Sequence, residues 1–542
     1  MIEGEQFDRR RRSTKGVCPV SAEHKAAPRE QFTGQVGFIL SAIGSAVGLG
    51  NIWRFPGVAY ENGGGAFMVP YLVALLTAGI PILFLDYALG HRFRGGAPQA
   101  FRRVKGWLES LGWFQVMICI LIAVYYAVVV AWAGSFFVYS FGLDWGDDAA
   151  SFFVGEHLQL ADVGGADPWF TFDFVAAVLI PLVIVWVAVI AVLAAGVVKG
   201  VERANVVFIP LLVVAFGILV VRSLFLEGAV DGLNVLFTPD WSRLGDASVW
   251  IAAYGQIFFS LSVAFGIMIT YSSYRARKAN MTSPGLVVAF SNSGFELFAG
   301  LGVFSALGFL AAQEGVTVAD LNFQGVLLAF VTFPTIVSQM PAGAFFGALF
   351  FGSLVMAGFT SLVSILQVVS AALQEKFALS RRAATLGMGI TLGVVSVLGF
   401  STTTGLILLD TVDAFVNNLG IVGSAVFMCV FVVWVYRKAP ELRYHLNAVS
   451  TTQVGRWWYV CVGVIVPVML VIMLVQYVIE RIDKPYGDYD TTYLLITGWG
   501  SVLLLFVGAI LFTLPRWRGR EAFTVWPAYP PQDPAVMKEA SR

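Results

Sequence analysis

The feature that most constrains this chain is a series of long apolar stretches that recurs from near its start to near its end. Each stretch has about 20 residues or more, the length that an α-helix needs to cross the hydrocarbon core of a bilayer. Of the 542 residues, 58% are hydrophobic and only 13% are charged, which is more apolar surface than a soluble domain can bury. We therefore expect an all-α integral membrane protein with about 12 transmembrane helices. The expected spans are Gln35–Tyr60, Ala66–Leu89, Trp113–Phe141, Phe172–Ala195, Val201–Phe225, Val249–Tyr274, Gly285–Ala312, Gly343–Phe377, Ala383–Thr404, Leu406–Tyr436, Trp457–Ile479 and Tyr493–Leu514.

The basic residues of the short loops predict how these spans are oriented. Lys and Arg cluster in the cytoplasmic loops of membrane proteins, and here they follow every second span, as at Arg92, Arg275 and Arg381. The loops on the other side are acidic or neutral. We expect a multi-pass protein of the cell inner (plasma) membrane with both termini in the cytoplasm. The apolar segment Val316–Val337 contains Asp320, Asn322 and Pro334 and is expected to pack on the outer side without crossing.

Composition also narrows the function. The formal net charge is +0, so the sequence predicts no nucleic-acid partner. The four cysteines and the four histidines lie far apart, without the spacing of a metal site or a disulfide framework. An integral-membrane enzyme would need a nucleophile with a base, or metal ligands, near one membrane face, and we find neither pattern. We expect no enzyme.

Two spans carry residues that do not suit a continuous lipid-facing helix. The first contains Gly44, Gly48 and Gly50 followed by Asn51, Arg54 and Pro56, and the sixth is polar and small from Ser260 to Gly266. Interrupted spans in corresponding positions of two halves point to a transporter site at the midplane. The alternative for the first span alone is a kinked structural helix, since glycine and proline are common in membrane helices.

An unwound stretch frees backbone carbonyl and amide groups for ligands. Carbonyl and hydroxyl oxygens suit a hard cation such as sodium, and amides at the start of a half-helix suit a carboxylate. A zwitterionic amino acid would use both kinds of group. Small residues at Gly48 and Gly50 would let such a substrate approach the backbone closely.

The run from Ala46 to Pro56 (AVGLGNIWRFP) and the run from Glu61 to Phe67 (ENGGGAF) resemble the neurotransmitter:sodium symporter family, which includes bacterial LeuT-like amino acid transporters. Tyr125-Tyr126, Gln256-Ile-Phe-Phe259 and Ala357-Gly-Phe-Thr360-Ser361 extend the resemblance to nearly the whole chain. It implies a LeuT-type 5+5 inverted repeat with helices 1 and 6 unwound at mid-membrane and two extra helices. The implied regions are an N-terminal segment with inner-gate residues (1–34), a first five-helix repeat (35–226), a second inverted repeat (248–437), helices 11 and 12 (457–515) and a cytoplasmic tail (516–542).

The resemblance also implies sites for two sodium ions and one substrate. The first ion would be held by Ala46, Asn51, Ser260 and Asn292, together with the substrate carboxylate, and the second by Gly44, Val47, Ala357, Thr360 and Ser361. Tyr126 would bond the carboxylate and Phe259 would lie over the substrate. The whole implied substrate pocket consists of Ser45, Ala46, Gly48, Gly50, Ile122, Tyr126, Phe259, Ser260, Ser262, Phe265, Ser361 and Ile365.

Three positions bear on specificity. Monoamine transporters of the family have an aspartate where Gly48 stands, so the resemblance favours a substrate with its own carboxylate. Ile122, Phe265 and Ile365 would face its side chain and favour a neutral, apolar one. Glu296, surrounded by Tyr71 and Gln256, stands where chloride-dependent members have a serine, and implies a chloride-independent symporter. Glycine, taurine and GABA remain alternative substrates.

Two ion pairs are implied as gates. Arg54 would pair with Asp413 at the outer side, and Arg29 with Glu375 at the inner side, where Phe32 and Tyr274 would pack. Proton-driven carriers, uniporters and non-transporting receptors are less consistent with the intact ion-site residues. The expected partners are the substrate, the lipid bilayer and, as an open alternative, a second copy in a homodimer.

Overall fold

The structure, a computed structural model, describes residues 30–161, 170–321 and 325–519. Regular structure in these ranges is almost entirely helical, and the β-type pairing that they contain is limited to two isolated bridges, Gly64 with Pro239 and Phe174 with Thr402. The prediction of an all-α membrane fold is therefore confirmed. The second bridge also explains why the fourth span begins at Ala176, because the expected start at Phe172 is extended chain.

Ten helices in the described ranges are long and apolar enough to cross a membrane. Several are continuous spans assembled from shorter α-helical pieces. They are Gly65–Phe93 (with α3, Met68–Ala74, and α4, Ile80–Phe93), Gly106–Tyr139 (with α6, Glu109–Tyr139), Ala176–Ala195 (α8), Val197–Leu224 (with α9, Arg203–Leu224), Thr282–Glu314 (α13), Gly343–Phe377 (α16), Arg381–Phe400 (α17), Gly405–Val435 (with α18, Gly405–Phe415, and α19, Val422–Met428), Trp457–Asp483 (with α21, Trp457–Val460, and α22, Val466–Asp483) and Thr491–Thr513 (with α23, Thr491–Leu494, and α24, Gly500–Thr513).

The remaining two expected spans are the broken ones. The first consists of α1 (Gln35–Ala46) and α2 (Leu49–Glu61), which meet at an angle of 51°. The sixth consists of α11 (Ala247–Ser260) and α12 (Ile267–Ser273), each too short to cross alone. Between them Ser262, Ala264 and Gly266 all have positive φ, at 52°, 65° and 92°. A helix cannot continue through such residues, so both interruptions expected from the sequence are present.

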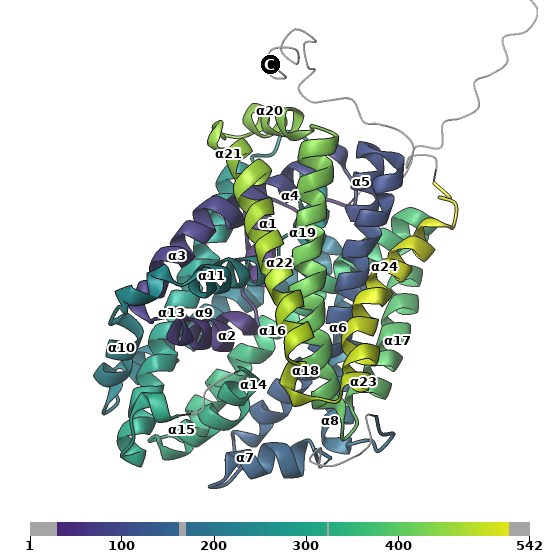
Figure 1. The fold of residues 1–542 in the computed structure, drawn as a ribbon. Coiled ribbons are helices and arrows are strands. Elements are labelled where there is room, and N and C mark those ends of the chain that lie inside the picture. Colours follow the sequence, from purple (N-terminus) through teal and green to yellow (C-terminus); the bar gives the residue numbers. More distant parts are fainter. Residues whose placement is uncertain (1–29, 162–169, 322–324, 520–542) are drawn as a thin grey trace, which may run out of the picture.

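Shorter helices cover the two ends of the bundle. In Figure 1, α5 and α20 lie at one end of the bundle. The short helices α7, α14 and α15 lie at the other end, near α18 and α23. The described part of the expected outer segment Val316–Val337 contains a short apolar helical stretch, Gly325–Gln339, which is shorter than the spans. The bounds of these short helices are Ala97–Val104 (α5), Ala149–Ser151 (α7), Ala229–Phe237 (α10), Gly325–Leu327 (α14), Phe333–Gln339 (α15) and Ala439–Val449 (α20).

Burial separates a central set of helices from a peripheral one. The span Gly106–Tyr139 is largely buried inside the protein, whereas α8 and α24 expose most of their apolar side chains, including Ile184, Val187 and Leu503. Exposed apolar helix faces of this extent fit contact with lipid. The central helices therefore carry the interior site.

Candidate functional site

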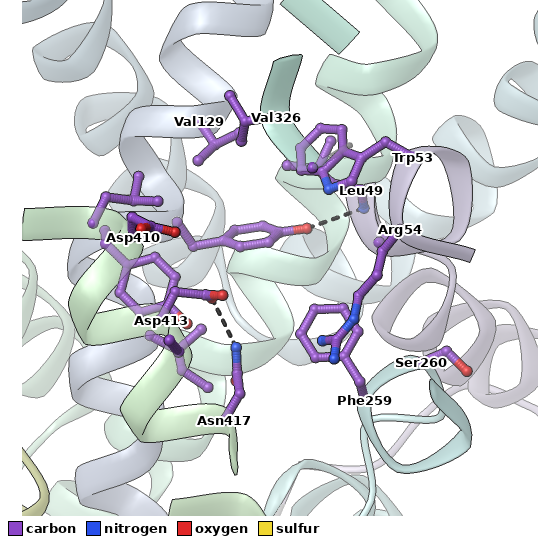
Figure 2. Close-up of a pocket in the computed structure, with 18 of the residues that line it drawn as sticks. Leu49, Trp53, Arg54, Val129, Phe259, Ser260, Val326, Asp410, Asp413 and Asn417 are labelled. Carbon is purple, nitrogen blue, oxygen red and sulfur yellow. Dashed lines mark hydrogen bonds between the residues drawn. The ribbon is translucent and has the colours of Figure 1, made fainter. Parts of the chain in front are cut away.

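A cavity of about 670 Å³ lies where the two helix breaks face α6, α16 and α18. Every residue that the sequence analysis assigns to the substrate pocket lines this one cavity. The cavity also reaches Val326 of α14 and Asp410 and Asp413 of α18 (Figure 2), and Tyr486 and Tyr489 line it too. The structure thus joins residues from five separate spans, in an arrangement that spacing along the chain does not show.

The residues of the first expected ion site form one hydrogen-bonded chain of side chains. Asn51 Nδ2 donates to Asn292 Oδ1 at 2.9 Å, and Asn292 Nδ2 donates to Ser260 Oγ at 3.0 Å. All three side chains are buried, and so is Ala46 at the end of α1. Each side chain carries an oxygen, which is the donor type that a hard cation such as sodium prefers.

The residues of the second expected ion site lie between the end of α1 and the middle of α16. Ser361 Oγ donates to the Gly44 carbonyl oxygen at 3.2 Å, and Thr360 Oγ1 donates to the Ala357 carbonyl oxygen at 3.1 Å. Val47 follows directly after α1 and is buried. Carbonyl and hydroxyl oxygens from two helices therefore meet there, away from bulk water.

The start of α2 presents backbone amides to the cavity. The Gly48 amide donates to Asn51 Oδ1 at 2.8 Å, and the Leu49 amide donates to the Tyr126 hydroxyl at 3.3 Å (Figure 2). Amides at a helix N-terminus suit a carboxylate, and here the side chains of Asn51 and Tyr126 accept from them. Gly50 is needed here, because a Cβ at that position would lie 2.3 Å from Cε1 of the Phe259 ring. The Phe259 ring therefore packs directly on the backbone of the break.

The other end of the cavity is apolar. Ile122, Phe265 and Ile365 line the cavity and are each exposed by 6% or less, whereas its charged lining residues are Arg54, Glu61, Asp410 and Asp413. An apolar side chain of a ligand could be buried there without losing hydrogen bonds to water. A charged side chain would lose its hydration and would find no opposite charge there.

Glu296 is fully buried in α13, one helical turn beyond Asn292. Gln256 Nε2 donates to Glu296 Oε1 at 2.6 Å, and the Tyr71 hydroxyl donates to Glu296 Oε2. The structure therefore brings Tyr71 and Gln256, the two residues that the sequence analysis groups around this carboxylate, into contact with it. Buried carboxylates require such donors, because an unpaired charge inside a protein is strongly unfavourable.

The expected outer ion pair is not formed in this structure. The Arg54 guanidinium stacks on the Phe259 ring, 4.3 Å from its centroid, while Asp413 lies across the cavity and accepts a hydrogen bond from Asn417 Nδ2 at 2.7 Å (Figure 2). The ion pairs of the described residues do not include Arg54 with Asp413. The physical reason is the open cavity itself, which keeps α2 and α18 apart at this level.

At the opposite end the path is filled by side chains. Phe32 packs edge-on against Tyr274, as expected, with ring centroids 6.3 Å apart. It also packs edge-on against Tyr271, with ring centroids 5.6 Å apart. Both carboxylate oxygens of Glu375 accept from the Gly96 amide at 3.0 Å. Arg29, the expected partner of Glu375, lies outside the described residues. The cavity is therefore open on one side and closed on the other.

One functional residue was missed by the sequence analysis. Asp86 is fully buried in α4, and its Oδ2 accepts a hydrogen bond from the Ala264 amide at 2.8 Å. Because Ala264 lies in the break between α11 and α12, this carboxylate stabilises the unwound backbone there. The signal was present in the sequence, since a charged residue inside an apolar span is seldom without a role.

A helix bundle with two broken spans around a cavity that opens to one side defines a membrane transporter. Comparison with known proteins identifies the kind: the model of the sodium:neurotransmitter symporter family matches residues 29–154 and 144–517. An uncharacterized sodium-dependent transporter of Methanocaldococcus jannaschii, MJ1319, is 36% identical over 496 residues, which cover 91% of this chain and 99% of that protein. The human sodium- and chloride-dependent creatine transporter 1 is 32% identical over 76% of this chain and 71% of its own length.

Among solved structures, the crystal structure of MhsT in complex with L-phenylalanine matches with a TM-score of 0.70 and 31% identity, covering 82% of this chain and 99% of that one. The chain therefore belongs to the sodium:neurotransmitter symporter family. Its fold is of the LeuT type, it is a multi-pass membrane transporter that uses sodium, and it is not an enzyme.

Proposed function

We propose that this protein is a sodium-coupled, chloride-independent symporter that imports a neutral, apolar amino acid by alternating access. One substrate binds in the cavity between the helix breaks, and two sodium ions bind beside it. The observation that carries the proposal is the juxtaposition of three groups in one buried site: amides at the start of α2, side-chain oxygens of Asn51, Asn292 and Ser260, and an apolar end.

These groups fit the two charges and the side chain of an amino acid. The substrate carboxylate binds the amides of the break and the Tyr126 hydroxyl, and its oxygen completes the first ion site. The ammonium group binds carbonyl oxygens of the two unwound segments. Ile122, Phe265 and Ile365 surround an apolar side chain. Because the substrate supplies a ligand to the ion, binding of one strengthens binding of the other.

Glu296 supports chloride independence. It places a fixed negative charge one turn from Asn292, so the first sodium ion has an anion nearby without chloride. Several relatives, including the creatine transporter and the human taurine transporter, are sodium- and chloride-dependent by name. The archaeal relative is described only as sodium-dependent.

The open side of the cavity faces the cell exterior in this proposal. Both termini lie in the cytoplasm, since the basic loops fall at the end of the bundle with α5 and α20. The structure then represents an outward-open state. Closure on that side would bring Arg54 to Asp413, and opening on the inner side would separate Phe32 from Tyr274.

A second candidate substrate class is a small zwitterion such as glycine, taurine or GABA. Relatives named as transporters of creatine, taurine and glycine support it, whereas the phenylalanine complex of MhsT supports an apolar amino acid. Ile122, Phe265 and Ile365 favour the latter, because the space that they line would stay partly empty around glycine or taurine.

Thermal stabilisation distinguishes these candidates. The purified protein is heated in sodium chloride, sodium gluconate or potassium chloride with each of the twenty amino acids and with glycine betaine, taurine and GABA. A ligand that binds only the folded state raises the melting temperature. We expect an apolar amino acid to stabilise equally in both sodium salts and not in potassium. Stabilisation by taurine or GABA alone would favour the second class, and stabilisation in potassium would contradict sodium coupling.

A further inference from the structure

The last two spans hold α18 through an apolar cluster that is separate from the main core. Its buried members come from the span Gly405–Val435, which begins with α18, and from α23: Ile407, Ala414, Phe415, Leu419, Tyr493 and Leu494. The Phe415 ring packs against the rings of Tyr477, Tyr486 and Trp499, with centroids 5.3 to 6.4 Å apart. This cluster makes α18 part of one unit with helices 11 and 12.

A carboxylate anchors the connecting segment to this unit at the edge of the cavity. Tyr486 and Tyr489 lie between α22 and α23, and their hydroxyls donate to the two oxygens of Asp410, at 2.9 Å to Oδ1 and 3.2 Å to Oδ2. The Arg481 guanidinium lies 5.4 Å from the centroid of the Tyr486 ring. Hydrogen bonds to a carboxylate are about twice as strong as neutral ones, and here two of them converge on one group.

The position of Asp410 links this anchor to the outer gate. Asp410 lies three residues before Asp413 in α18, so the two carboxylates share a helix face, and both line the cavity. Two like charges at this spacing repel each other, and phenol donors to Asp410 disperse part of that charge. Asp413 has Tyr125 and Asn417 as hydrogen-bonded neighbours, and Arg54 lies across the cavity from it.

We propose that Tyr486, Tyr489 and Asp410 form a latch that holds α18 in place at the outer entrance and so positions Asp413 to pair with Arg54 when the entrance closes. The latch rests on the proposed function, because it acts on the closing step of that transport cycle. In this role the last two helices support the stationary side of the outer gate. The three residues are positioning residues, since they act through Asp413.

Single hydroxyl deletions test the latch. Tyr486→Phe and Tyr489→Phe keep the ring packing and remove one hydrogen bond each to Asp410. Tyr477→Phe is the matched control, because its hydroxyl belongs to the same cluster but donates to the Ala414 carbonyl oxygen at 3.3 Å. The measurement is the rate at which tritiated L-leucine or L-phenylalanine, whichever stabilises the wild-type protein more in sodium, leaves the detergent-solubilised protein.

We expect each latch variant to release the amino acid about tenfold faster than the wild type, and the control to stay within about twofold. The decisive comparison introduces the same substitutions into the Asp413→Asn protein. If the latch acts through the gate, release from the Asp413→Asn protein is already fast and Tyr486→Phe adds nothing to it. An equal effect in both backgrounds, or no effect in the native background, would overturn the proposal.

Asp410→Asn provides a second route if either tyrosine variant fails to fold, because it keeps the shape of the side chain and removes its charge. It should accelerate release to the same extent. If the wild-type protein binds no apolar amino acid in sodium, the proposed function fails and the latch with it. If the wild type binds in a sodium-dependent way and all latch variants release at the wild-type rate, only the latch fails.

Discussion

Replacing Glu296 with serine removes a buried negative charge and leaves two donors, the Tyr71 hydroxyl and Gln256 Nε2, facing an empty space. Glu296 is four residues beyond Asn292, a rise of about 6 Å along α13. At an effective dielectric constant of about 20, a unit charge at that distance attracts a sodium ion by about 3 kcal/mol. Without an anion we therefore expect the sodium affinity of the Glu296→Ser protein to fall by about a hundredfold.

Chloride should restore much of this loss, because the donors that bind the carboxylate can bind a halide. A ligand at ten to one hundred times its dissociation constant contributes about 1.4 to 2.7 kcal/mol. The assay is the half-saturating sodium concentration for uptake into proteoliposomes, in chloride and in gluconate. The wild type should give the same value in both salts, and Glu296→Ser should require chloride.

Glu314→Ser is the matched control, since Glu314 is exposed at the end of the same helix. It should behave as the wild type in both salts. The reasoning is refuted if Glu296→Ser transports equally well in gluconate and in chloride. If that variant is inactive in both, sodium-dependent thermal stabilisation measured in each salt decides whether ion binding has become chloride-dependent.

Three further substitutions have defined outcomes. Tyr126→Phe removes the hydroxyl that accepts from the start of α2 and should weaken substrate binding by about tenfold or more. Equilibrium binding measures this change, and an unchanged affinity would exclude a contact between Tyr126 and the substrate carboxylate. Gly50→Ala places a methyl group 2.3 Å from the Phe259 ring. The steric strain, about 1 to 3 kcal/mol, should weaken substrate binding. Normal binding would show that the ring moves freely. Burial raises the pKa of Glu441 in α20, but the hydrogen bond from Lys438 and the charges of Lys438 and Arg92 outweigh it and hold the pKa below the usual 4.5. A lowered pKa stabilises the folded state above the unfolded value, so Glu441→Gln should lower the melting temperature at pH 7 by an amount that shrinks below about pH 4.5; a difference that does not change with pH would contradict this.

Much of the architecture could be predicted from the sequence because membrane insertion limits the choices. Twenty-residue apolar stretches have to become helices in lipid, and clusters of glycine and polar residues in two of them mark where the helix stops. The break after α11 was expected from Ser260 and Gly266, but the positive φ of Ala264 was not. No side-chain preference encodes that value, which depends on the Asp86 carboxylate binding the Ala264 amide from another helix.

The site was predictable residue by residue only through the family resemblance. Asn51 and Asn292 are 241 positions apart and bond directly, and periodicity alone does not bring them together. The sequence analysis did not single out Tyr486 and Tyr489, because their partner Asp410 lies in a distant part of the chain. The expected pair of Arg54 and Asp413 is not formed, since whether a gate is open depends on the conformation and not on the residues alone.

The most direct test of the central claim is counterflow in proteoliposomes that contain the purified protein. The vesicles are loaded with an unlabelled apolar amino acid, and entry of the same amino acid in labelled form is measured in sodium and in potassium. We expect accumulation of label in sodium chloride and in sodium gluconate, and none in potassium chloride. Equal accumulation in potassium would contradict sodium coupling, and accumulation in sodium chloride but not in sodium gluconate would contradict the role assigned to Glu296.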